Sequence, residues 1–196
     1  MKITQTDRIE AQKVVKEFRK EKTDREIFYN LCFAIMAPQT TFINNRKATA
    51  KLIEHDFYNK NIDDSLLYDL IRETRFYRQK TDRLSRAKKQ FRDILECLRA
   101  DASSFEKREY LVKNVKGLGM KAASHLLRNM GCTNLAIIDT HVLKFLHKET
   151  PKNKREYIEM EEAFNSKAKK RGLLPAELDA IIWKQYSNTN WNNFVY

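Results

Sequence analysis

Four glycines and three prolines are all that this chain of 196 residues contains. Strands joined by tight turns need many more of them, because glycine and proline supply the backbone conformations of turns. Apolar residues instead recur at helical spacing, as at Ile9, Val14, Val15 and Phe18, with charged residues between them. We therefore expect an all-α fold whose helices are joined by short connections.

The same spacing predicts helices along most of the chain. The expected helices span residues 6–20, 24–37, 41–55, 64–72, 82–98, 105–115, 139–146, 154–171 and 175–186. The second of these is apolar on most sides, so we expect it at the centre of the core, and Pro38 ends it. The helix over 82–98 is long, basic and amphipathic.

The formal net charge is +12 at pH 7. Clustered lysine and arginine release counterions from phosphates, so a protein this basic is typical of those that bind a polyanion. The alternative is a charged surface that serves only solubility. Because the chain also holds 26 acidic residues, the positive charge must gather on one face to bind DNA or RNA.

Cysteines and apolar runs exclude several classes of protein. Cys32, Cys97 and Cys132 fit neither a disulfide framework nor the paired cysteines of a zinc site, so we expect no metal and no cofactor. The first residues lack the apolar core of a signal peptide, and no apolar run approaches the ~18 residues of a membrane span. We expect an intracellular protein of the cytoplasm or nucleoid, monomeric and without a membrane partner.

Two of the four glycines, Gly117 and Gly119, stand two residues apart between two amphipathic segments. The stretch 109–125 therefore predicts a helix, a tight hairpin and a second helix. The amides of such a turn, at the start of the second helix, form a pocket for one phosphate oxygen. An ordinary turn is the alternative, but in a chain of charge +12 the pattern indicates binding to a DNA backbone.

Lys121 follows this hairpin and falls in the first turn of the next helix. The positive end of the helix dipole and the nearby Lys116 both favour its neutral amine, which is the nucleophilic form and the one that builds a Schiff base. The alternative is a solvated lysine that contacts phosphate as a point charge.

Asp139 follows the apolar run 135–138 and precedes a predicted helix. Aspartate in this position caps a helix N-terminus well. A carboxylate held at the end of an apolar segment also stays ionised and can face a cation that forms opposite it. The two interpretations are compatible.

These segments resemble the helix-hairpin-helix DNA glycosylase superfamily, whose hallmark is a Gly-x-Gly-x-Lys hairpin followed by an apolar run and Asp-x-His. The phrases 108–112, 123–131 and 178–183 are similar to the second, archaeal and bacterial, family of 8-oxoguanine DNA glycosylases. Residues 37–41 and 47–52 look like the region where endonuclease III-type enzymes place an inserting glutamine. The resemblance extends roughly from Ile27 to Trp183.

The resemblance implies two helical lobes with a DNA-binding cleft between them. One is a helical barrel, 38–131, which ends in the helix-hairpin-helix; the other joins both termini, 1–37 with 132–196. The implied partner is double-stranded DNA that contains a damaged base, and the implied activity is that of a bifunctional glycosylase and lyase in base excision repair. An oxidised purine, 8-oxoguanine above all, is flipped out and excised, and β-elimination cleaves the strand.

The resemblance also implies a role for each site residue. Lys121 is the nucleophile, and Asp139 stabilises the oxocarbenium-like charge. The residues implied to bind the DNA backbone are Lys116, Gly117, Gly119 and His141. Trp183 lines the base pocket, and Gln39 fills the gap left by the flipped base.

Two departures concern base recognition. The family ends in a lysine that helps to read the oxidised base, and the matching position here is near Asn192; the Pro38–Gln39 loop differs as well. The chain also lacks the four cysteines that bind an iron–sulfur cluster in many endonuclease III-type enzymes. An endonuclease III-like glycosylase for oxidised pyrimidines is the nearest alternative, and a non-catalytic helix-hairpin-helix DNA-binding protein is an alternative of another class.

Overall fold

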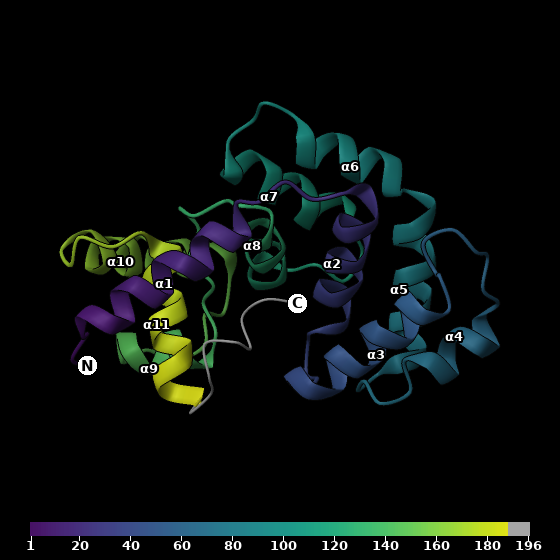
Figure 1. Ribbon diagram of the computed structural model, residues 1–196, viewed down its shortest axis with the longest axis horizontal. Coiled ribbons are helices and arrows are strands. Elements are labelled where there is room, and N and C mark those ends of the chain that lie inside the picture. Colours follow the sequence, from purple (N-terminus) through teal and green to yellow (C-terminus); the bar gives the residue numbers. More distant parts are fainter. Residues whose placement is uncertain (188–196) are drawn as a thin grey trace. The chain divides into compact units, whose positions relative to one another are not determined.

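The computed structural model of the chain describes residues 1–187, and its regular structure there is entirely α-helical (Figure 1). The helices are α1 (Gln5–Phe18), α2 (Asp24–Met36), α3 (Phe42–Glu54), α4 (Asp64–Leu70), α5 (Tyr77–Lys89), α6 (Phe91–Arg99), α7 (Ser104–Asn114), α8 (Met120–Asn129), α9 (Thr140–Leu146), α10 (Lys154–Lys169) and α11 (Pro175–Ser187). No strand occurs within residues 1–187, which confirms the expected all-α fold. No helix among these residues is both long and apolar enough to cross a membrane.

The chain divides into two compact units. Unit 1 comprises Met1–Glu21 and the chain from Leu127 onward, and unit 2 comprises Lys22–Leu126. Unit 1 therefore contains α1, α9, α10 and α11, unit 2 contains α2 to α7, and α8 crosses the boundary. The lobes expected from the sequence, 38–131 and 1–37 with 132–196, remain a prediction; the two divisions differ most over 22–37, which contains α2.

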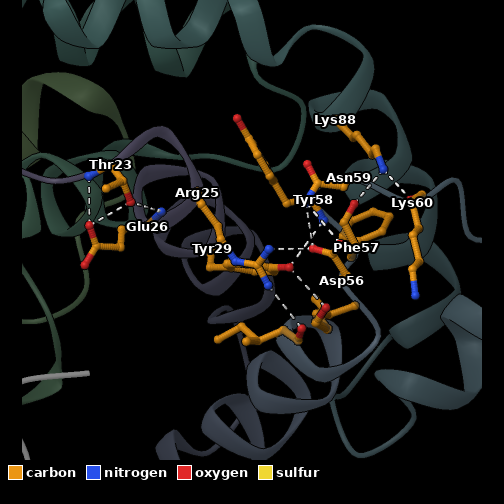
Figure 2. Close-up of polar contacts among 12 residues, drawn as sticks. Thr23, Arg25, Glu26, Tyr29, Asp56, Phe57, Tyr58, Asn59, Lys60 and Lys88 are labelled. Carbon is orange, nitrogen blue, oxygen red and sulfur yellow. Dashed lines mark hydrogen bonds and ion pairs between the residues drawn. The ribbon is translucent and has the colours of Figure 1, made fainter.

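Reciprocal capping fixes where several helices begin. At the start of α2 the Thr23 hydroxyl accepts the Glu26 backbone N–H at 3.3 Å, and the Glu26 carboxylate accepts the Thr23 backbone N–H at 2.8 Å (Figure 2). These bonds satisfy helix N–H groups that have no partner within the helix. The same arrangement opens α1 at Thr4 and Asp7 and α7 at Ser103 and Glu106. An N-cap of this kind contributes about 1 kcal/mol.

Helix α2 forms the centre of unit 2, as its all-round apolar sequence predicts. Its residues from Leu31 to Met36 are buried, and Cys32 is among them as a small apolar residue. The Phe28 ring lies 5.5 Å from the ring of Phe57 and 5.0 Å from that of Phe91. Burial of the thiol raises the pKa of Cys32, so this cysteine stays protonated and unreactive.

Polar contacts hold the connection between α3 and α4 (Figure 2). Arg25 of α2 forms an ion pair with Asp56 at 2.6 Å. The Lys88 ammonium of α5 donates to the carbonyls of Phe57 and Lys60, both at 2.5 Å. The connection is therefore tied to two helices of unit 2.

The single helix expected over 82–98 is wrong. Two helices, α5 and α6, replace it, and the break is at Gln90, whose φ of −99° and ψ of 15° leave the helical region. The Gln90 side-chain amide donates to the Asn114 carbonyl at the end of α7, at 3.3 Å. This distant contact accompanies the break, and no glycine or proline marks it in the sequence.

Helix α11 is the centre of unit 1, where it packs against α1, α9 and α10. Its residues from Ala176 to Ile182 are buried. One of them, Asp179, forms an ion pair at 2.7 Å with Arg128 of α8, and both side chains are almost fully buried. The C-terminal part of α8 is thereby fixed to the helix on which Trp183 lies.

Candidate active site

A tight hairpin joins α7 to α8. Within it the Leu118 backbone N–H donates to the Val115 carbonyl at 3.1 Å. Gly117 adopts φ +98°, which residues with a side chain rarely adopt, and a Cβ there would lie 2.5 Å from Arg83 Cδ. The turn therefore requires glycine, and the helix-hairpin-helix predicted over 109–125 is confirmed.

Gly119 lies on the open side of this hairpin. No atom lies within 4 Å of the place where its Cβ would be. Its carbonyl accepts the Ala123 N–H at 2.9 Å, in the first turn of α8. Open space beside the positive end of a helix dipole suits an anion such as a phosphate oxygen. Lys116, at the tip of the hairpin, is exposed and lies 3.5 Å from the Asp82 carboxylate.

Lys121 is the second residue of α8, and its side chain is exposed. The next two residues, Ala122 and Ala123, are buried and anchor this turn of the helix. Among residues 1–187 the Lys121 amine has no hydrogen-bond or ion-pair partner. A rigid turn thus presents an amine that is open to an external electrophile.

Asp139 caps the N-terminus of α9. Its Oδ1 atom accepts the backbone N–H groups of His141 at 2.9 Å and Val142 at 2.8 Å. The other oxygen, Oδ2, accepts no hydrogen bond from residues 1–187. The capping interpretation is confirmed, and it uses one oxygen only, which leaves the second for a positive charge.

The segment before Asp139 is held rigidly by α10. The Tyr157 hydroxyl donates to the Ala136 carbonyl at 3.0 Å and accepts the Ile138 N–H at 3.2 Å. The Glu161 carboxylate accepts the Ala136 N–H at 2.9 Å. Extended backbone that has no sheet partner is thereby satisfied by side chains, and Asp139 is fixed at its end.

His141 and Trp183 lie on two helices of unit 1 that pack together, α9 and α11. The His141 ring is 6.3 Å from the Tyr186 ring, between centroids, and its Nδ1 atom is buried with no hydrogen-bond partner among residues 1–187. Trp183 is half-buried. The structure therefore groups Asp139, His141 and Trp183 within one unit.

Unit 2 contains the other predicted site residues. Lys116, Gly117, Gly119 and Lys121 belong to one hairpin, whereas Gln39 is exposed in the connection between α2 and α3. Lys121 and Asp139 thus belong to different units, and their approach across a sugar-sized gap stays a prediction. The position near Asn192 lies outside the described residues.

Sequence reasoning missed a buried lysine, Lys80, and an exposed aromatic residue, Phe76. A helix expected to start at Asp82 leaves both in a connection, but α5 begins at Tyr77. No local signal marks Lys80, because its hydrogen-bond partners lie some forty residues earlier in the chain, at separations of 40 to 44. Within residues 1–187 no group of three or more histidine, cysteine or acidic side chains is placed to bind a metal ion.

An all-α fold with this hairpin, a lysine in the following turn and a capping aspartate defines the class of helix-hairpin-helix DNA glycosylases. Residues 10–173 match the family described as 8-oxoguanine DNA glycosylase (Ogg-HhH). The chain belongs to this family.

Individual relatives agree with this assignment. The 8-oxoguanine DNA glycosylase/AP lyase of Picrophilus torridus is 34% identical over 178 residues, which cover 86% of this chain and 84% of the relative. The crystal structure of the Methanocaldococcus jannaschii 8-oxoguanine glycosylase/lyase in complex with a 15mer DNA containing 8-oxoguanine matches with a TM-score of 0.84 and 29% identity, over 95% of this chain and 93% of that one. The 8-oxoguanine DNA glycosylase of Thermotoga maritima matches with a TM-score of 0.81 and 27% identity, over 91% and 89% of the two chains.

Proposed function

We propose that this protein excises 8-oxoguanine from double-stranded DNA and then cleaves the strand at the resulting abasic site. The relatives that match most of the chain are named 8-oxoguanine DNA glycosylase/AP lyase, and one structural relative is in complex with DNA containing this lesion. The proposed nucleophile is Lys121, and the proposed electrostatic partner is Asp139. We also propose that the protein acts as a monomer, on genomic DNA in the nucleoid.

Base excision begins with the Lys121 amine in its neutral form, because only the free electron pair can attack carbon. This pair forms a bond to C1′ of the flipped nucleotide, and the C1′–N9 bond breaks, with its electrons leaving on the base, which takes up a proton. The sugar carbon is cationic as that bond stretches. The Oδ2 atom of Asp139, which accepts no hydrogen bond from residues 1–187, supplies a fixed negative charge for it.

Strand cleavage follows from the Schiff base. The nitrogen bound to C1′ loses a proton, and its electron pair forms the C1′=N bond as the C1′–O4′ bond breaks. The ring oxygen takes up a proton, which gives a protonated imine between Lys121 and C1′. The protonated imine acidifies the C2′ hydrogens, so that a base removes one of them, a C2′=C3′ double bond forms and the C3′–O3′ bond breaks. The leaving group is the 3′ part of the strand, which carries the phosphate as its 5′ end. Water then hydrolyses the imine and regenerates the amine.

The remaining site residues have proposed roles in DNA binding. The hairpin with Lys116, Gly117 and Gly119 holds a backbone phosphate at the start of α8, and His141 holds a second phosphate. Open space at Gly119 and the net charge of +12 support this. Trp183 lines the base pocket and Gln39 fills the gap in the duplex; both roles assume a DNA cleft between the two lobes.

The observation that carries the proposal is the partner-free amine of Lys121 in the first turn after the hairpin. Borohydride should therefore reduce the Schiff base and trap the protein covalently on 8-oxoguanine DNA. Lys121→Gln should abolish trapping and cleavage while DNA binding persists. Lys113→Gln, which removes an exposed lysine of α7 just before the hairpin, is the matched control and should still trap. Unchanged cleavage by Lys121→Gln would refute the assigned nucleophile.

Lesion preference and oligomeric state need separate measurements. A panel of duplexes, each with one damaged base, should give fastest excision for 8-oxoguanine; faster excision of an oxidised pyrimidine would favour the endonuclease III-like alternative. Light scattering of the protein on a sizing column should give the mass of one chain, 23.3 kDa.

A further inference from the structure

The Lys80 side chain is buried and fully satisfied by hydrogen bonds. It exposes 1% of its surface, and its ammonium donates to the Met36 carbonyl at 2.7 Å, the Pro38 carbonyl at 3.0 Å and the Thr40 hydroxyl at 2.6 Å. A lysine ammonium has three N–H donors, so these three acceptors use all of them. Burial, with a smaller contribution from the charge of Arg83, lowers the pKa of Lys80 to about 8. Among residues 1–187 this ammonium has no acidic partner. Burying such a cation is costly unless hydrogen bonds satisfy it, as the three acceptors do here.

The acceptors of Lys80 surround Gln39. Pro38 and Thr40 are its neighbours on either side, and Met36 ends α2 just before them. Gln39 has φ +55°, in the left-handed region that residues other than glycine avoid. Its side chain is exposed, so no packing of its own accounts for this conformation. The ammonium of Lys80 thus fixes the turn that presents Gln39.

Lys80 also lies in the first turn of α5, which begins directly after a second residue of positive φ, Phe76. The Lys80 backbone N–H donates to the Phe76 carbonyl at 3.1 Å. Phe76 has φ +59°, and 47% of its surface is exposed, with the Arg75 guanidinium 4.9 Å from the ring centre. Residues in sparsely populated conformations persist where the surrounding structure holds them, and they cluster at sites of function.

The segments next to the two turns are in contact. The Asn44 side-chain amide, in the first turn of α3, donates to the Glu73 carbonyl, three residues before Phe76, at 3.2 Å. Five exposed cations lie within eight residues of Gln39 or Phe76 in the sequence, together with the exposed Glu73, which pairs with Lys51 at 2.6 Å. The five cations are Arg46, Lys47, Arg72, Arg75 and Arg78. A basic surface with an exposed amide and an exposed aromatic ring fits a nucleic acid whose bases are partly unstacked.

We propose that Lys80 is a positioning residue whose ammonium ties the turn of Gln39 to the first turn of α5, beside Phe76, so that Gln39 and Phe76 belong to one surface that holds the duplex where a base has been flipped out. This inference rests on the proposed function. In this proposal Lys80 contacts no reacting atom, and its ammonium acts only by holding the turn of Gln39 against α5. Its loss should therefore impair reactions that need a distorted duplex and spare those that do not.

Two substrates separate these reactions. Excision from an 8-oxoguanine duplex requires flipping, whereas borohydride trapping on a single-stranded abasic site requires only the amine and the sugar. Lys80→Met should slow duplex excision by about 100-fold, the loss expected when binding groups shift by about 1 Å, and should leave single-strand trapping close to that of the unsubstituted protein. Thr40→Val removes one acceptor and leaves the cation in place. It should slow duplex excision by about tenfold, the loss expected for one hydrogen bond to a charged group.

Lys88 provides the matched control. Its ammonium also joins two backbone carbonyls of a connection in unit 2, those of Phe57 and Lys60 (Figure 2). Lys88→Met should lower the unfolding temperature and leave the ratio of duplex excision to single-strand trapping unchanged. The Thr40 backbone amide donates to the Ala37 carbonyl, and its hydrogen exchange should accelerate in Lys80→Met but not in Lys88→Met.

The outcomes discriminate between the two proposals. The proposed role of Lys80 would be wrong if Lys80→Met and Thr40→Val each lost duplex excision and single-strand trapping equally. It would also be wrong if Lys88→Met changed the ratio of the two reactions as much as Lys80→Met does. Neither outcome would contradict the glycosylase activity. Absence of trapping by the unsubstituted protein would contradict both the proposed function and the proposed role of Lys80.

Discussion

Replacing Arg128 with leucine should remove about 3–5 kcal/mol from the free energy of unfolding, the range found when one partner of a buried ion pair is lost. Arg128 and Asp179 lie 2.7 Å apart, and their side chains are only 9% and 7% exposed. The guanidinium also donates to the Asn129 side-chain carbonyl at 3.2 Å and lies 4.7 Å from the centre of the Phe18 ring. Leucine has none of these contacts and leaves the buried Asp179 carboxylate without this guanidinium.

For a chain of this size each kcal/mol corresponds to about 2–4 °C, so the unfolding temperature should fall by about 6–20 °C. Circular dichroism during thermal and urea unfolding measures this directly. The matched control is Arg155→Leu, which breaks an ion pair with Glu159 whose side chains are 87% and 57% exposed. It should cost about 0.5 kcal/mol or less, because water screens exposed pairs.

The double variant Arg128→Leu with Asp179→Leu tests the electrostatic explanation. It should recover much of the stability, since an apolar pair can replace a buried ion pair. If Arg128→Leu costs no more than the exposed control, the buried pair does not stabilise unit 1, and the reasoning is refuted.

Three further predictions concern the hairpin, Lys80 and the net charge. Gly117→Ala should lower both stability and DNA affinity, because φ is +98° and the new Cβ would meet Arg83. Gly119→Ala has open space around it and should lower only the DNA affinity. Equal unfolding temperatures for the two variants would contradict this. Lys80 binds its proton less tightly in the folded state, with a pKa of about 8 against 10.5, so the unfolded chain holds more protons between these values. The free energy of unfolding of the unsubstituted protein, relative to that of Lys80→Met, should therefore rise between pH 8 and 10.5, by at most about 1.4 kcal/mol per pH unit. Parallel curves of unfolding free energy against pH for the two proteins would contradict the lowered pKa. DNA affinity should fall steeply with salt, as the net charge of +12 implies, and a flat titration would argue against phosphate binding.

Features of this molecule that depend on a few neighbouring residues could be predicted from the sequence. The hairpin at Gly117 and the cap at Asp139 belong to this group, because a positive φ and a capping carboxylate each act within a turn. Lys121 falls in the first turn of its helix for the same reason.

Features that depend on distant packing could not be predicted. The side chain at the Gln90 break binds a carbonyl 24 residues away, and the acceptors of Lys80 lie 40 to 44 residues away. In both cases the residue itself suits a surface helix, so the local pattern predicts an ordinary helical position. The division of the chain into units arises from contacts of the same distant kind.

The two oxygens of Asp139 have separate roles, one in capping α9 and one in the proposed catalysis. An amide side chain would keep the first role and remove the second. Asparagine keeps an oxygen for the backbone N–H groups of His141 and Val142, and it ranks beside aspartate as a helix cap. It replaces the second oxygen, Oδ2, with an uncharged NH2 group. Asp139→Asn should therefore yield a well-folded protein that binds damaged DNA without excising the base or cleaving the strand. Such a variant could serve as a probe that labels lesions and leaves them in place.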